Sequence, residues 1–148
     1  MDEWNTLETE HFKVMYVDTD DLKVFDRKIT YGNKWYKRIP LEERLEKIYD
    51  KTRRMLGTKP PKKKIEILVH HNQEHLGATF TDTFLKNNSK ICAWYNYHRN
   101  RICVNARTIA NNILAHEIGH ALTDHHFGQR PPRPMAEIIA RYVGGRFR

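Results

Sequence analysis

The chain has 148 residues, a length typical of one domain with its own hydrophobic core. Charged residues make up 30% of it and hydrophobic residues 39%, which fits a globular protein and excludes a disordered or fibrous one. No apolar run approaches the length of a membrane span. The sequence therefore predicts a single folded domain over residues 1–148.

The formal net charge is +8, and much of it comes from short basic runs such as residues 62–64. Solvated surface explains such runs. The alternative is attraction to nucleic acid, to an anionic membrane or to acidic protein. No recognisable nucleic-acid-binding module accompanies the charge. The charge alone therefore identifies no partner, and the sequence does not predict the oligomeric state.

The N-terminus begins Met1-Asp2-Glu3-Trp4 and lacks a basic segment followed by an apolar one. We therefore expect a cytoplasmic protein, although a chain from which an export signal had been removed would look the same. Cys92 and Cys103 have no C-x-x-C partners and can face each other across a hairpin. Without an export signal, two thiols are favoured over a disulfide.

The first half of the chain predicts two strands and one clear helix. Apolar residues alternate within residues 11–17, as in a half-buried strand. Residues 22–39 have a mixed pattern, and we expect a long excursion there with a short helix. Apolar residues repeat at helical spacing from Pro40 to Gly57, and these two residues suit the start and the C-cap of a helix. Residues 65–69 have good strand propensity.

Three histidines follow that second strand, namely His70, His71 and His75. They can bind a metal ion, but their spacing matches no known site. We therefore expect surface histidines at a strand end.

The second half predicts a hairpin and two helices. Residues 91–95 and 101–105 are strands joined by a short turn. A largely apolar helix is expected over residues 108–125, and a shorter one over residues 135–143. Together the elements predict an α+β fold with a small mixed or antiparallel sheet.

The first of these two helices contains the stretch His116-Glu117-Ile118-Gly119-His120. Residues four apart share one helix face, so both imidazoles can reach one metal ion, with Glu117 beside it. Two histidines on a buried helix need polar partners, and a metal ion supplies them. The alternative is a pair of hydrogen-bonded core histidines. Glycine within a helix costs about 1 kcal/mol relative to alanine, so Gly119 predicts close approach by a neighbouring element.

A catalytic zinc ion usually has three protein ligands, and three residues are candidates for the third. Asp124 lies one turn further on the same helix face, although three ligands on one straight helix converge poorly. His126 has the spacing of a longer zinc motif that needs glycine at the position of Thr123. Glu137 lies on the last helix, which can fold back and return its carboxylate to the metal.

The stretch from His116 to His120, followed by Glu137-Ile138-Ile139-Ala140-Arg141-Tyr142, resembles the gluzincin pattern of zinc metallopeptidases, H-E-x-x-H followed by E-x-x-A-x-Y. The order of the earlier elements is also similar to peptidase MA-like members of that clan. The resemblance implies a zincin-like fold in which His116, His120 and Glu137 bind zinc and Glu117 is the catalytic carboxylate. Ala140 is small enough to let the two helices approach. Larger gluzincins supply a Tyr or His to the oxyanion, and Tyr142 and His125 are the candidates here.

The function expected from this resemblance is zinc-dependent hydrolysis of peptide bonds, with a metal-bound water and Glu117 as general base. The strand before the active-site helix can offer an edge to an extended peptide, which places residues 91–105 along the cleft. One alternative is a regulatory peptidase that cuts a single protein partner. Another is a catalytically weak zincin-like fold that acts as a binding module.

Overall fold

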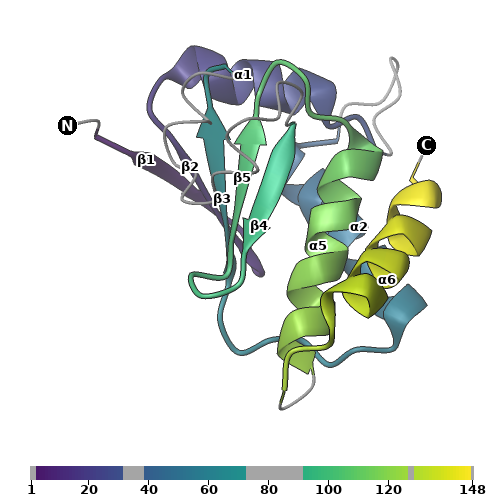
Figure 1. Ribbon diagram of the computed structural model, residues 1–148. Coiled ribbons are helices and arrows are strands. Elements are labelled where there is room, and N and C mark those ends of the chain that lie inside the picture. Colours follow the sequence, from purple (N-terminus) through teal and green to yellow (C-terminus); the bar gives the residue numbers. More distant parts are fainter. Residues whose placement is uncertain (1–2, 32–38, 73–91, 127–128, 148) are drawn as a thin grey trace.

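The computed structural model describes residues 3–31, 39–72, 92–126 and 129–147. In this part of the chain, helices pack against a five-stranded mixed sheet of strand order β1-β2-β3-β5-β4 (Figure 1). The two outer pairs, β1 with β2 and β4 with β5, are antiparallel, whereas β2, β3 and β5 run parallel. The strands are β1 (Asn5–Glu8), β2 (Phe12–Tyr16), β3 (Ile65–His70), β4 (Ala93–Asn96) and β5 (Arg101–Asn105). The helices are α1 (Thr19–Lys28), α2 (Leu41–Leu56), α5 (Asn111–His126) and α6 (Arg133–Gly145).

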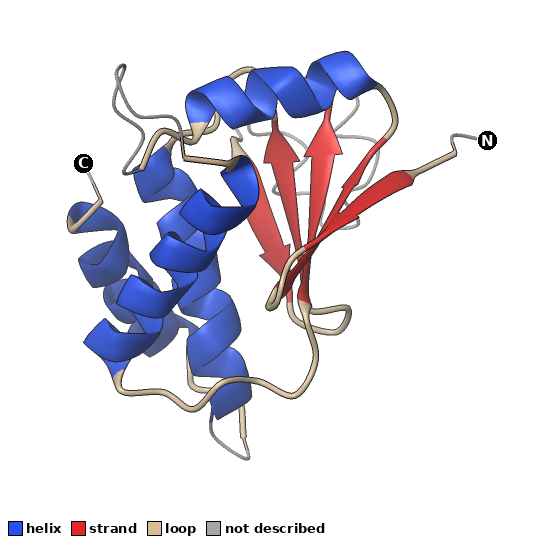
Figure 2. Ribbon diagram, turned by 180° about the vertical axis from the view of Figure 1, so that it is seen from behind, coloured by secondary structure: helices blue, strands red, loops and turns tan. Residues whose placement is uncertain are grey.

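The main core lies between one face of the sheet and the helices α1, α2 and α5. The view from behind shows α2, α5 and α6 together on one side of the sheet (Figure 2). Alternate residues of the three parallel strands point into this core, as expected for strands with one face against helices. The strand residues that belong to this apolar core are Phe12, Val14, Ile65, Ile67, Val69, Ile102 and Val104.

The predicted strands and the helix after Pro40 are confirmed, but the sequence reading missed β1 and the extent of α1. Asp18 begins α1 as its N-cap, and its side chain accepts a hydrogen bond from the Asp20 N–H at 2.9 Å. The segment after Asp18 is therefore a helix rather than only the end of a strand. Gly57 ends α2 in the left-handed conformation, with φ 66°, as its position predicts.

The expected surface position of the histidines after β3 is wrong for His70. Its side chain is completely buried, and its ring lies edge-on to Trp4. His71 is partly exposed and pairs with Asp21, with Nδ1 at 2.7 Å from Oδ1. His75 lies outside the described residues.

Helices α5 and α6 pack closely side by side (Figure 1). A Cβ atom on Gly119 would lie 3.4 Å from the Val143 side chain and 3.6 Å from the Cα atom of Ala140. The predicted close approach at Gly119 is thus confirmed, and α6 is the neighbour. A Cβ atom on Gly144 would lie 3.0 Å from the Asn112 carbonyl oxygen and 3.4 Å from the His116 Cβ atom. Small residues on both helices therefore set how near α6 comes to His116.

Both helices differ from their predicted bounds by a few residues. Helix α5 begins at Asn111 rather than at residue 108. The N–H groups of Thr108 and Ile109 both donate to the Asn105 carbonyl oxygen and form a separate turn before it. Helix α6 begins at Arg133 rather than at residue 135, because a proline at position 134 is tolerated in the first turn of a helix.

Cys92 and Cys103 are free thiols. No helix among the described residues is both long enough and apolar enough to cross a membrane.

The two neighbouring glycines near the end of α6 offer a matched test of this packing. Gly144→Ala should lower the free energy of unfolding by about 1–3 kcal/mol, because the added methyl group overpacks the contact with α5. Gly145→Ala adds the same methyl group where nothing lies within 4 Å, and should be neutral or stabilise by up to about 1 kcal/mol. Urea denaturation of both variants measures the difference. Equal stabilities would contradict the packing described.

Candidate metal centre

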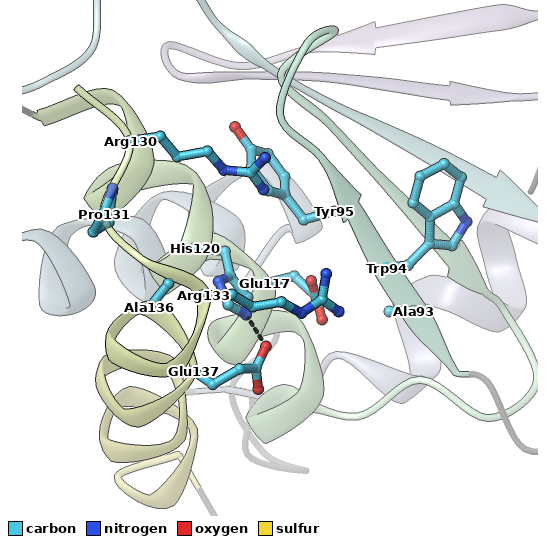
Figure 3. Close-up of a pocket in the computed structure, with 10 residues that line it drawn as sticks. All are labelled: Ala93, Trp94, Tyr95, Glu117, His120, Arg130, Pro131, Arg133, Ala136 and Glu137. Atoms are coloured by element: carbon cyan, nitrogen blue, oxygen red, sulfur yellow. Dashed lines mark ion pairs between the residues drawn. The ribbon is translucent and has the colours of Figure 1, made fainter. Parts of the chain in front are cut away.

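The helix pair brings three predicted ligands together. His116 and His120 lie one turn apart on α5, with ring centroids 5.0 Å apart. Glu137 projects from α6 between them. Its Oε1 atom is 2.8 Å from His120 Nε2 (Figure 3). Its Oε2 atom is 3.6 Å from His116 Nε2. One ligand atom from each residue lies within 4.8 Å of the others.

This donor set fits a zinc ion. Two imidazole nitrogens and one carboxylate oxygen are a common ligand set of catalytic zinc, which leaves one position open. Zinc bonds of about 2.0–2.1 Å in a tetrahedron hold the ligand atoms roughly 3.3 Å apart. The observed nitrogen–oxygen distances of 2.8 and 3.6 Å lie on either side of that value. Small rotations of these side chains therefore suffice to bind the ion.

The two other candidates for the third ligand lie elsewhere. The buried carboxylate of Asp124 accepts a hydrogen bond from Arg130 Nε at 3.0 Å. The Nδ1 atom of His126 accepts one from the Lys59 N–H at 3.2 Å. Neither residue belongs to the group formed with His116 and His120, whereas Glu137 does.

The protonation of this group also suits a metal ion. Burial lowers the pKa of His116, and the neighbouring His120 lowers it further. A lower pKa favours the neutral imidazole, which is the form that binds metal.

Glu117 lies next to the three ligands and lines the cavity beside them. Burial raises the pKa of its carboxyl group to about 8, Glu137 raises it too, and Arg133 opposes the shift. A bound cation nearby would favour the ionised form, because opposite charges stabilise each other. Glu117 is therefore placed to exchange a proton at the site rather than to form a fixed ion pair.

Two cavities flank the group and share Glu117. The first, here called the β4-side cavity, has a volume of about 350 Å³ and is bordered by β4, His120, Glu137 and Arg133. The second, here called the α6-end cavity, has a volume of about 390 Å³ and is bordered by His116, Arg141 and the end of α6. The three candidate ligands thus lie between two spaces that can hold a ligand of small to moderate size.

Strand β4 forms the sheet edge beside the site. It is the last strand in the sheet order, and Ala93, Trp94 and Tyr95 border the β4-side cavity. Tyr95 points towards the helices and Trp94 away from them (Figure 3). The expectation that the strand directly before the helix offers the edge is wrong, because that strand is β5 and it lies between β3 and β4.

The two residues considered for the oxyanion border neither cavity. The side chain of Tyr142 is 52% exposed. The ring of His125 stacks on Tyr97, with centroids 4.8 Å apart. The sequence reading did not single out Arg133 and Arg141 for the site, although both border it.

A second His/Glu group among the described residues consists of Glu10, His11 and Glu46. Here both oxygens of Glu46 already accept hydrogen bonds. The Thr9 hydroxyl donates to Oε2 at 2.6 Å, and the His11 ring nitrogen lies 2.5 Å from Oε1. These contacts connect α2 to the start of β2, so a structural role accounts for the group without a metal ion.

Comparisons of the chain with known protein families, with curated proteins and with solved structures find no match. Function is therefore inferred from the residues of the site.

The purified protein should bind one equivalent of zinc. His116→Ala, His120→Ala and Glu137→Gln should each weaken zinc binding by more than roughly 100-fold, because removing a ligand costs at least as much as removing its supporting partner. Competition titration with a chromogenic chelator measures the affinity.

His126→Ala is the matched control, since it removes a histidine of the same helix that lies outside the group. It should keep the affinity of the unchanged protein. If His126→Ala lost zinc and Glu137→Gln kept it, the assignment of Glu137 as the third ligand would be wrong.

Proposed function

We propose that this protein is a zinc-dependent peptide hydrolase with a zincin-like fold. The proposal is carried by one observation: two imidazoles from α5 and the Glu137 carboxylate from α6 converge beside Glu117, at a cavity bordered by a sheet edge. This grouping supports the gluzincin arrangement that the resemblance of the sequence motifs implies.

In this proposal His116, His120 and Glu137 hold zinc, which when bound polarises a carbonyl group and lowers the pKa of water. Glu117 takes a proton from the attacking water and delivers it to the leaving nitrogen. The raised pKa of Glu117 makes its carboxylate a stronger base, and a zinc ion nearby would favour the ionised form that accepts the first proton. Glu117 borders both cavities and so lies beside the path of a peptide that crosses the site.

The peptide would bind as an added strand along β4. Among the described residues, no strand pairs with β4 on the side away from β5, and its main-chain groups on that side would make this pairing. Burial raises the pKa of Tyr95, and its hydroxyl donates to Asn100 Oδ1 at 3.0 Å. Tyr95 therefore stays neutral and contributes a fixed aromatic wall to the β4-side cavity.

Glu117→Gln is the decisive variant for this function. It should lower the rate of peptide hydrolysis by roughly 10²- to 10⁴-fold, because the general base is lost while the shape of the site is kept. Zinc should remain bound at one equivalent. The assay is cleavage of a degenerate fluorogenic peptide library by zinc-loaded protein.

Glu43→Gln is a matched control, since Glu43 is exposed on α2. It should keep full activity. Undiminished hydrolysis by Glu117→Gln, or by protein stripped of zinc, would refute the mechanism. A zinc-loaded protein that cleaves no library member would favour the binding-module alternative.

A further inference from the structure

We infer that the substrate is an acidic polypeptide segment, with Asp or Glu side chains on both sides of the bond to be cleaved, bound by Arg133 and Arg141. This inference rests on the proposed function, because it assigns a substrate class to the same site.

The two arginines lie on either side of the candidate ligand Glu137. Residues 133, 137 and 141 are spaced four apart on α6 and so form one stripe along the helix. Arg133 borders the β4-side cavity, and Arg141 borders the α6-end cavity. A peptide that crosses the site would therefore meet one guanidinium group before the cleaved bond and one after it.

Neither arginine forms an ion pair with another described residue. Arg133 reaches from the start of α6 across the β4-side cavity towards Glu117 (Figure 3). Arg141 borders the α6-end cavity together with His116 and Glu117. Each arginine therefore lines the same space as residues of the centre.

The position of Arg133 is unfavourable for the helix itself. It is the first residue of α6, where the positive end of the helix dipole disfavours a cation, and the first turn contains no acidic residue. A cation at this end does not stabilise the fold. Residues that break a local rule in this way are expected at binding sites.

The charge balance of the loaded site also favours an anionic ligand. The two charges of a zinc ion are offset by the carboxylates of Glu117 and Glu137, and the ligand histidines are neutral. Arg133 and Arg141 then determine the sign of the potential in the two cavities. Arg130 also borders the β4-side cavity, but it is bound to the buried Asp124 and lies over the Tyr97 ring.

A peptide fits this arrangement better than a nucleic acid. The cavities have volumes of about 350 and 390 Å³ and lie on either side of a reactive centre, as side-chain subsites do. Nucleic acid is bound instead over an open surface, typically about 1,000 Å² or more.

The test uses three fluorogenic peptide libraries with the same degenerate core, flanked on both sides by Asp-Glu, by Gln-Gln or by Lys-Lys. Zinc-loaded protein should cleave the acidic library at least roughly ten times faster than the neutral one at low salt, and the basic library slowest. Arg133→Gln/Arg141→Gln should remove most of this preference through a higher KM, with kcat nearly unchanged.

Lys23→Gln/Arg27→Gln is the matched control, because it removes the same charge from exposed positions of α1. It should leave the preference intact. An equal loss of preference in this control would mean that net charge, rather than the two arginines, selects the substrate, and would overturn the inference. A fall in kcat that is the same for all three libraries in the site variant would also overturn it, because the arginines would then act on the chemical step.

Binding is measured separately by fluorescence anisotropy of the libraries with zinc-loaded Glu117→Gln protein. Cleavage of the neutral and acidic libraries at equal rates would refute the inference and leave the proposed hydrolase intact. Arginine-dependent binding of the acidic library without any cleavage would refute the hydrolase and support the recognition of acidic peptide. A 20-base-pair DNA that displaces the acidic library and loses this ability in Arg133→Gln/Arg141→Gln would overturn the inference in favour of nucleic acid.

Discussion

The candidate site depends on the close contact between α5 and α6. Gly119, Ala140 and Gly144 leave almost no side-chain volume between the two helices, and this lets the Glu137 carboxylate reach both imidazoles. The contact would also link metal binding to folding, since a metal bound only by the folded helix pair would stabilise that pair. Glycine costs helical stability on its own, so the close approach has to compensate for it.

Electrostatics then divides the residues of the site by role. Burial lowers the pKa of His116, which favours the form that binds metal, and raises the pKa of Glu117, the candidate proton acceptor. Asp124 and Arg130 bind each other at the end of α5 and are removed from the chemistry. Arg133 and Arg141 keep their charge available on either side of the centre. The same short helix thus provides a candidate ligand and the groups that would select the substrate.

Much of this could be predicted from local patterns. The spacing of His116 and His120 fixes their helix face, and glycine within a helix indicated a close neighbour, which the structure identifies as α6. Periodicity could not reveal β1, a four-residue strand with mainly exposed residues. It also could not place the sheet edge, because strand order depends on pairing between distant segments: β5 inserts between β3 and β4. The cap of α1 was readable, since Asp18 is followed by two further acidic residues and the helix ends in Arg27 and Lys28. Arg133 could not be identified from the sequence, because its proposed role depends on the cavity that it borders, and distant segments of the chain form that cavity.

The central claim is that His116, His120 and Glu137 form one zinc centre. X-ray absorption spectroscopy at the zinc edge tests it most directly on the zinc-loaded protein. We predict a four-coordinate ion with two imidazole ligands and the remainder oxygen, at about 2.0–2.1 Å, and one imidazole fewer in His120→Ala. A sulfur ligand at about 2.3 Å, or a spectrum unchanged by His120→Ala, would contradict the account.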